Sequence, residues 1–242
     1  MLKAILTGHS RGLGAAICNE LLGRAIPVLG ISRRALGDVS RNAELLEQVE
    51  LDLSAPAALS AWLAAGELSR RLEGCSRLLL INNAGMVEPV GPPGVQDPAA
   101  VARAVSVNVA APLMLADAVC AQQRAGEVRV LHVSSGAGRS AYPGWSIYCA
   151  TKAALDHHAR AAALDGVAAL RICSLAPGVI DTDMQAAIRA TPLERFPLRE
   201  RFEGMKRDGS LASPEECAGK LVSFLLDDGF GREPVADLRT LS

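Results

Sequence analysis

The stretch Thr7-Gly8-His9-Ser10-Arg11-Gly12-Leu13-Gly14 decides the fold, and it follows directly on the apolar run Leu2–Thr7. Its three glycines allow a tight turn between a strand and a helix, and they let the backbone approach a phosphate at the helix N-terminus. Such a turn is typical of the first βα unit of a dinucleotide-binding sheet. The spacing G-x-x-x-G-x-G differs from the common G-x-G-x-x-G pattern, so an ordinary strand–helix turn stays open as the alternative.

Beyond this turn, short apolar runs alternate with amphipathic stretches to the end of the chain. The predicted strands are Lys3–Thr7, Pro27–Ser32, Gln48–Leu51, Arg77–Asn82, Val128–Ser134, Leu170–Ala176 and Pro234–Leu238. The predicted helices are Leu13–Gly23, Ala55–Leu72, Pro98–Arg124, Tyr148–Leu164 and Pro214–Leu226. Repeated strand–helix alternation with strands that are apolar on both sides predicts an α/β fold. We expect residues 1–242 to form a single domain, with a doubly wound (Rossmann-like) parallel sheet and helices on both faces.

One segment departs from the alternation. Asp183–Ser210 is charged, contains two prolines and shows no clear period. We therefore expect it to be a mobile insertion near the site that covers the substrate.

Composition narrows the functional classes. Of the 242 residues, 50% are hydrophobic and only 3% aromatic, and the net charge is −1, which argues against a nucleic-acid-binding surface. The six cysteines form no C-x-x-C pair, which favours free thiols in a reducing compartment. We predict a cytoplasmic protein without a signal peptide and without an apolar run long enough to span a membrane.

The chemistry of the site is indicated by Tyr148 and Lys152, with Ser135 thirteen positions before the tyrosine. Residues i and i+4 share a helix face, so the lysine ammonium is expected to lower the pKa of the phenol. A phenol and a serine hydroxyl in a chain that begins with a dinucleotide loop suggest proton transfer coupled to hydride transfer. Ser134 is the alternative hydroxyl. A serine hydrolase is disfavoured because the chain contains no G-x-S-x-G motif.

The end of the second predicted strand bears on the choice between NAD and NADP. It reads Ile31-Ser32-Arg33-Arg34 and lacks the carboxylate that would bind a ribose 2′-hydroxyl. We expect Arg11 and Arg33 to bind a 2′-phosphate, because guanidinium groups match phosphate oxygens; two solvated surface arginines are the alternative. Asp52, at the end of the third strand, is placed to receive the adenine amino group.

These residues together resemble the short-chain dehydrogenase/reductase family over nearly the whole chain. The resemblance rests on the Thr7–Gly14 loop, Asn82-Asn83-Ala84-Gly85, Asn108 in Val107-Asn108-Val109, Ser135, Tyr148, Lys152 and Pro177-Gly178 with Thr182. It implies a catalytic tetrad of Asn108, Ser135, Tyr148 and Lys152, in which Asn108 orients a water; a mid-helix asparagine bonded to backbone is the alternative. It also implies an NADP(H) site. The residues expected to hold that cofactor are Gly8, Ser10, Arg11, Gly12, Leu13, Gly14, Arg33, Asp52, Leu53, Asn83, Ala84, Gly85, Tyr148, Lys152, Pro177, Gly178, Val179 and Thr182.

Within this family, the late chain resembles the sepiapterin and benzil reductases. The resemblance rests on Pro177–Gln185, on Asp227-Asp228-Gly229-Phe230 and on Asp237. It implies NADPH-dependent reduction of a ketone or diketone, with Ser135, Trp145, Tyr148, Gln185 and Asp237 contacting the substrate. For Trp145 ordinary packing is the alternative, and for Asp237 a surface position at the end of a strand.

Three further expectations follow from the same resemblance and residues. We expect a homodimer, with a tetramer second. We expect no metal, because the adjacent His157 and His158 point in different directions on a helix. A cofactor-sensing regulator of the same fold, with little catalysis, is the alternative function.

Overall fold

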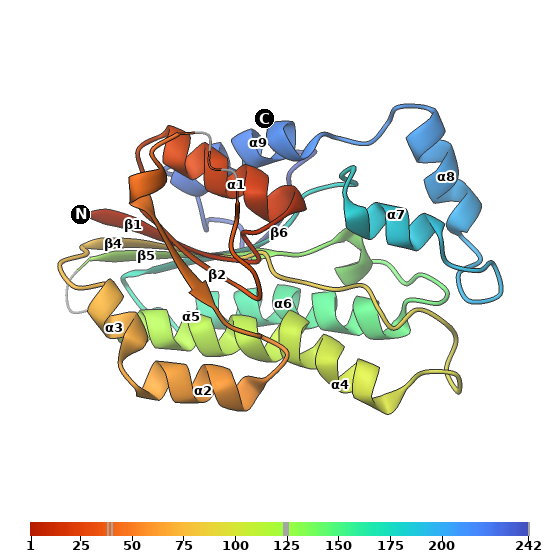
Figure 1. Ribbon diagram of the computed structural model, residues 1–242, viewed down its shortest axis with the longest axis horizontal. Helices are drawn as coiled ribbons and strands as arrows, with labels where there is room; N and C mark the ends of the chain where they lie inside the picture. The colour runs from red at the N-terminus through yellow and green to blue at the C-terminus, as the bar shows by residue number, and fades with distance from the viewer. Residues whose placement is uncertain (38, 40, 123–125, 242) are drawn as a thin grey trace.

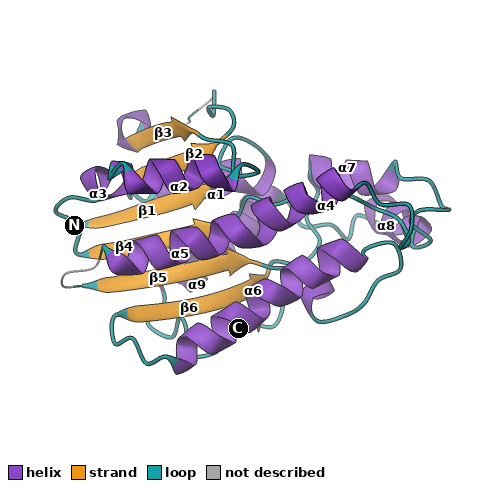
Figure 2. Cartoon of the chain, turned by 90° about the horizontal axis from the view of Figure 1, so that it is seen from below, coloured by secondary structure: helices purple, strands orange, loops and turns teal. Residues whose placement is uncertain are grey.

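The computed structural model describes residues 1–37, 39, 41–122 and 126–241. Seven parallel strands form one sheet in the order β3-β2-β1-β4-β5-β6-β7. Figure 2 shows the part of this order from β3 to β6. The strands are β1 (Leu2–Thr7), β2 (Val28–Ser32), β3 (Leu46–Glu50), β4 (Arg77–Asn82), β5 (Glu127–Val133), β6 (Leu170–Ala176) and β7 (Val235–Asp237). The predicted doubly wound parallel sheet is confirmed, with small shifts at the strand ends.

Helices cover both faces of the sheet (Figure 1). Alternate residues of β1 show why: Ala4 and Leu6 pack with α1 (Gly12–Gly23) and α9 (Pro214–Leu226), whereas Ile5 packs with the opposite layer. That layer contains α2 (Pro56–Ala64), α3 (Glu67–Arg71), α5 (Ala111–Ala121) and α6 (Ser146–Leu164). Side chains of one strand point alternately to the two faces, so both faces must be apolar.

Local sequence signals set several helix ends. The Ser213 hydroxyl accepts a hydrogen bond from Glu216 N–H at 3.1 Å, and Pro214 opens α9. Gly66, with φ of 72°, divides the predicted helix Ala55–Leu72 into α2 and α3. Glycine adopts this left-handed conformation without steric cost.

The predicted helix Pro98–Arg124 is also more complex, and Arg124 itself lies outside the described residues. It consists of α4 (Pro98–Val105), a π-helical segment (Ser106–Ala110) and α5. The stretch Pro98–Ala121 is long and apolar enough to cross a membrane, with a mean hydropathy of 1.7, contrary to our estimate of the apolar runs. It contributes buried side chains such as Leu115 and Val119 to the core under the sheet.

The segment Asp183–Ser210 differs from the sequence prediction. It forms two short helices, α7 (Asp183–Arg189) and α8 (Arg199–Arg207), joined through Phe196, which is fully buried. Both helices lie beyond the carboxyl ends of the strands (Figures 1 and 2). The absence of a clear period reflects the shortness of these helices rather than the lack of regular structure.

Candidate active site

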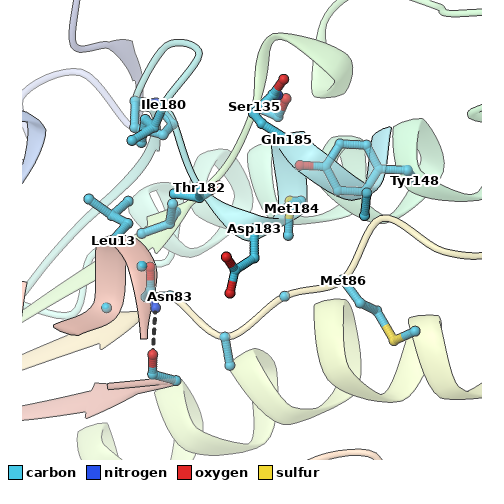
Figure 3. A pocket seen from close by; sticks show the side chains of 18 of the residues that line it. Leu13, Asn83, Met86, Ser135, Tyr148, Ile180, Thr182, Asp183, Met184 and Gln185 are labelled. Atoms are coloured by element: carbon cyan, nitrogen blue, oxygen red, sulfur yellow. Dashed lines mark hydrogen bonds between the residues drawn. The ribbon is translucent and has the colours of Figure 1, made fainter. Parts of the chain in front are cut away.

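A cavity of about 760 Å³ lies at the carboxyl ends of the strands (Figure 3). This is where the strand order reverses between β1 and β4, and where open parallel sheets bind their ligands. All eighteen residues that the sequence predicts for the cofactor line the cavity, as do Ser135, Trp145 and Gln185. Asn108 and Asp237 do not line it.

The glycine loop packs too closely for side chains at two positions. A Cβ on Gly8 would lie 2.9 Å from Ala84 Cα, and a Cβ on Gly14 would lie 1.9 Å from the Gly8 carbonyl oxygen. Asn83 fixes this arrangement, since its Nδ2 donates to the carbonyl oxygens of Thr7 and Gly8 at 3.1 and 3.2 Å. Backbone atoms of the loop Thr7–Gly14 therefore line a recess at the N-terminus of α1, here called the glycine cradle. Backbone N–H groups at a helix N-terminus suit the binding of a diphosphate.

At the far end of the cradle, Arg33, Arg34 and Asp52 line the cavity. Asp52 Oδ1 accepts a hydrogen bond from Ser54 N–H at 2.9 Å. This bond lowers the pKa of Asp52, with a smaller contribution from the charge of Arg33, so that Asp52 is an acceptor.

Arg11 lies in the mouth of the loop and faces the start of α7. Its Nη1 is 3.6 Å from Asp183 Oδ2, and both side chains are largely exposed. Figure 3 shows Asp183 directed into the cavity. Arg11 therefore links the glycine loop to α7, the helix that lies over the loop.

Tyr148 and Lys152 lie one turn apart on α6, and both are buried. Burial raises the pKa of Tyr148 to about 12, and a hydrogen bond with Ser135 acts in the opposite direction. The expected lowering by Lys152 does not occur, because Lys152 Nζ donates to the Val133 carbonyl oxygen at 2.8 Å and lies 5.7 Å from the centre of the tyrosine ring. Burial also lowers the pKa of Lys152, to about 8. The phenol is a protonated acid in this structure.

The two adjacent serines have different surroundings. Ser134 donates its hydroxyl to the buried Asp156 carboxylate at 2.7 Å. The Ser135 hydroxyl accepts from Ala137 N–H at 3.2 Å, and it is close enough to Tyr148 to oppose the rise in the pKa of the phenol. Both serines line the cavity with the tyrosine, but the Ser134 hydroxyl is committed to Asp156, so Ser135 is the serine that can serve a substrate (Figure 3).

Asn108 lies behind the cavity wall, within the π-helical segment. Its Nδ2 donates to the Met86 carbonyl oxygen at 2.8 Å and to Thr151 Oγ1 at 3.1 Å, and its Oδ1 accepts from Met86 N–H at 2.9 Å. Both amide hydrogens are thus in use. The side chain braces the loop after β4 against α6, which matches the backbone-bonded alternative, although the bond goes to another segment.

The wall opposite the glycine loop is aromatic. Trp145 stacks on Phe196, with ring centres 4.6 Å apart, and meets Tyr148 edge-on at 5.4 Å. Trp145 also lines the cavity, so it both forms part of the cavity wall and packs against the neighbouring aromatic rings. Phe202 and Met205 of α8 complete this side. The sequence analysis missed both, although their three-residue spacing on a helix was a usable signal.

Asp237 is placed behind another residue that the sequence analysis missed, Arg239. Both carboxylate oxygens of Asp237 accept from the Arg239 guanidinium, at 2.9 and 2.6 Å, and Arg239 lines the cavity. Nothing in the sequence distinguished Arg239 from the other arginines of the chain.

Comparisons with known proteins identify the family of the chain. The profile of the family described as short chain dehydrogenase matches residues 3–193. The chain is 35% identical to a benzil reductase, (S)-benzoin forming, from Bacillus cereus, over 95% of this chain and 96% of that protein. It is 34% identical to sepiapterin reductase from Mus musculus, over 93% and 92% of the two chains.

Solved structures show the same relationship. A short-chain dehydrogenase/reductase from Burkholderia vietnamiensis is 50% identical, with a TM-score of 0.72, and the match covers 100% of this chain and 98% of that one. The KRED1-Pglu enzyme is 28% identical, with a TM-score of 0.82, over 96% and 98% of the chains. The glycine cradle, the Ser135–Tyr148–Lys152 group and these matches lead to one conclusion: the chain belongs to the short-chain dehydrogenase family and is an oxidoreductase.

Proposed function

We propose that this protein is an NADPH-dependent carbonyl reductase that reduces small ketones and diketones. The observation that carries the proposal is that Tyr148, kept protonated by burial, lines with Ser135 a cavity that joins the glycine cradle to an aromatic wall. The similarity to benzil and sepiapterin reductases supports the same class of reaction.

The cradle fits a nicotinamide dinucleotide. Gly8 and Gly14 leave no room for a side chain, so the cradle presents backbone atoms to the cofactor. Asp52 is a hydrogen-bond acceptor that would bind the adenine amino group. Arg33 and Arg11 favour NADP over NAD, because both guanidinium groups line the cradle and a 2′-phosphate would accept from them. When bound, this cofactor supplies the hydride.

The chain itself supplies the proton and stabilises charge. Tyr148, kept protonated by burial, donates its proton to the substrate oxygen. Ser135 hydrogen-bonds that oxygen as negative charge develops on it. The Lys152 ammonium lies next to the tyrosine ring and would bind ribose hydroxyls of the cofactor. Asn108 fixes the position of the loop that contains Met86 through its hydrogen bonds.

The residues that line the cavity indicate which groups a substrate can carry next to its carbonyl. Trp145, Phe202 and Met205 give an apolar surface suited to an aromatic or alkyl group next to the carbonyl. α7 and α8 act as the cover of this chamber, since Gln185 and Ile188 from α7 also line it. The surfaces exclude water from the reacting atoms, which strengthens the hydrogen bonds there.

The direct test is NADPH oxidation with a panel of aromatic ketones and 1,2-diketones, followed by the variant Tyr148→Phe. We expect the native protein to reduce at least one diketone, and the variant to lose activity by about three orders of magnitude, since general acid catalysis contributes on the order of 10²–10⁴. NADPH binding, followed by cofactor fluorescence, should be retained. Binding of NADPH without reduction of any panel member would favour the regulatory alternative, and full activity of the variant would remove Tyr148 from the mechanism.

A further inference from the structure

Arg239 presents a fixed guanidinium to the substrate side of the cavity. Its side chain lies across Gly178, where a Cβ would come within 3.4 Å of Arg239 Cδ, and φ of Gly178 is +88°. Gly178 follows β6 at the carboxyl edge of the sheet, so Arg239 lies over the edge on which the reacting groups are placed.

Asp237 holds this guanidinium from behind. Nε donates to Oδ1 at 2.9 Å and Nη2 to Oδ2 at 2.6 Å, and the Arg239 backbone N–H also donates to Oδ1 at 3.0 Å. The Arg239 side chain is 65% exposed, whereas that of Asp237 is only 17% exposed. The carboxylate thus faces inward with its oxygens occupied, and the guanidinium faces the cavity.

The outer edge of the guanidinium still has donors to give. Within the described part of the chain, Nη1 makes no hydrogen bond, and Nη2 has a second hydrogen beyond the one given to Asp237. Two parallel N–H groups in one plane match the two oxygens of a carboxylate. Because Asp237 already fixes the plane, little side-chain entropy remains to be lost on binding.

The neighbours of Arg239 connect it to the reacting groups. Tyr142 lies close enough for its phenol to affect the pKa of Arg239, and its hydroxyl is 3.8 Å from where a Cβ on Gly136 would stand. Gly136 directly follows Ser135. A substrate whose carbonyl oxygen lies at Ser135 can therefore extend a second polar group along Tyr142 towards Arg239, with its apolar part against Trp145.

We propose that Arg239 binds a carboxylate of the substrate, so that aromatic ketones with a carboxylate beside the reacting carbonyl are preferred substrates. This rests on the proposed carbonyl reduction. Asp237 is a positioning residue that acts through Arg239, because both of its carboxylate oxygens are already bonded to Arg239 and not free to contact the substrate.

The test compares benzoylformate with its neutral isostere, methyl benzoylformate, in NADPH-dependent reduction. Arg239→Gln should raise KM for the acid at least tenfold, with kcat and the KM of the ester changed by less than threefold. Arg207→Gln, on the exposed end of α8, is the matched control and should change neither substrate. An unchanged KM for the acid in Arg239→Gln, or an equal rise for acid and ester, would overturn the proposal. A rise in Arg201→Gln instead would assign the carboxylate to this arginine of α8, which also lines the cavity, and would overturn it too.

Asp237→Asn separates positioning from direct contact. If Asp237 acts through Arg239, the double variant should have the same KM for benzoylformate as Arg239→Gln alone. Additive effects would show that Asp237 contacts the substrate itself and would overturn its assigned role.

A binding measurement keeps this inference distinct from the reaction. Calorimetry with phenylacetate and neutral phenylacetamide needs no turnover; we expect the acid to bind at least tenfold more tightly, and this preference to disappear in Arg239→Gln. Reduction of diketones without any such preference would refute the carboxylate site and leave the reductase standing. A preference for the acid without reduction of any ketone would support the site and remove the proposed reaction.

Discussion

Burial controls the ionisation of the two central side chains. Burial removes both side chains from water and therefore disfavours the charged form of each. It raises the pKa of Tyr148 to about 12 and lowers that of Lys152 to about 8. The sequence predicts the pair from the i, i+4 spacing, but it predicts the wrong direction for the tyrosine. Spacing shows that two groups share a face; it does not show that the ammonium is bonded to the Val133 carbonyl.

Cofactor choice is a second question at the residue scale. Arg33 lines the adenosine end of the cavity, and its charge lowers the pKa of Asp52. We expect Arg33→Asp to lower kcat/KM for NADPH by at least a hundredfold, because a guanidinium–phosphate contact is replaced by repulsion. kcat/KM for NADH should rise or stay unchanged. Arg41→Asp, another exposed arginine of the same half of the chain, serves as the control. Equal efficiency of the native protein with both cofactors would contradict the proposed NADP preference.

At the scale of elements, helices with a long amphipathic period are predicted well and short ones are not. α7 and α8 have seven and nine residues, and isolated helices of that length are unstable in water. Tertiary contacts stabilise them instead: Asp181 pairs with Lys206 and Arg189, and Phe196 packs on Trp145. The Asp181–Lys206 and Trp145–Phe196 contacts join residues far apart in the chain, so no local pattern in Asp183–Ser210 reveals them.

The π-helical segment gives the prediction at this scale. Asn108→Ala removes the side-chain partners of the half-buried Met86 N–H and carbonyl groups, and polar groups left unsatisfied away from water cost about 1–3 kcal/mol each. We expect the free energy of unfolding in urea to fall by about 2–4 kcal/mol. Ser106→Ala, in the same segment, should change it by less than about 0.5 kcal/mol. A fully stable Asn108→Ala protein that has lost activity would instead support the water-orienting role implied by the family.

Across the whole molecule, parallel strands bring distant motifs to one edge. The Thr7–Gly14 loop, Asn83–Gly85, Ser135 and Pro177–Thr182 meet around one cavity because each follows the carboxyl end of a strand. The alternation of elements predicts this meeting place from sequence alone. The alternation of strands and helices does not predict that Arg239 lines the cavity. The pairing of Arg239 with Asp237 depends on the conformation of the chain after β7, which no pattern of residue types in the sequence reveals.

The same edge of the sheet contains a pair of histidines, one fully buried and one half-buried. His132 of β5 is fully buried; its Nδ1 is 3.1 Å from Asn82 Nδ2, and its Nε2 is 3.1 Å from His158 Nδ1 on α6. Burial, with smaller contributions from the charges of His158 and Lys152, lowers the pKa of His132 to about 3. Burial also lowers the pKa of His158, although Asp165 opposes this. Both imidazoles are neutral in the folded protein at pH 7.

This pair makes the fold sensitive to acid in a defined pH range. In the unfolded chain both histidines bind a proton near pH 6.5, whereas the folded chain does not take up the proton on His132 until about pH 3. The unfolded state therefore binds more protons between these values. The contribution of the pair to stability is complete above pH 6.5 and is lost as the pH falls, by at most about 1.4 kcal/mol per pH unit for each histidine.

Replacing His158 by glutamine, a neutral side chain that does not titrate, should make unfolding less dependent on pH. We expect the free energy of unfolding, measured in urea from pH 7 to pH 5, to fall less steeply in His158→Gln than in the native protein, whatever the stability of the variant at pH 7. His157→Gln, at the exposed neighbouring position of α6, is the control and should keep the native slope. A native slope in His158→Gln would mean that other titrating groups, and not His158, govern the loss of stability in acid.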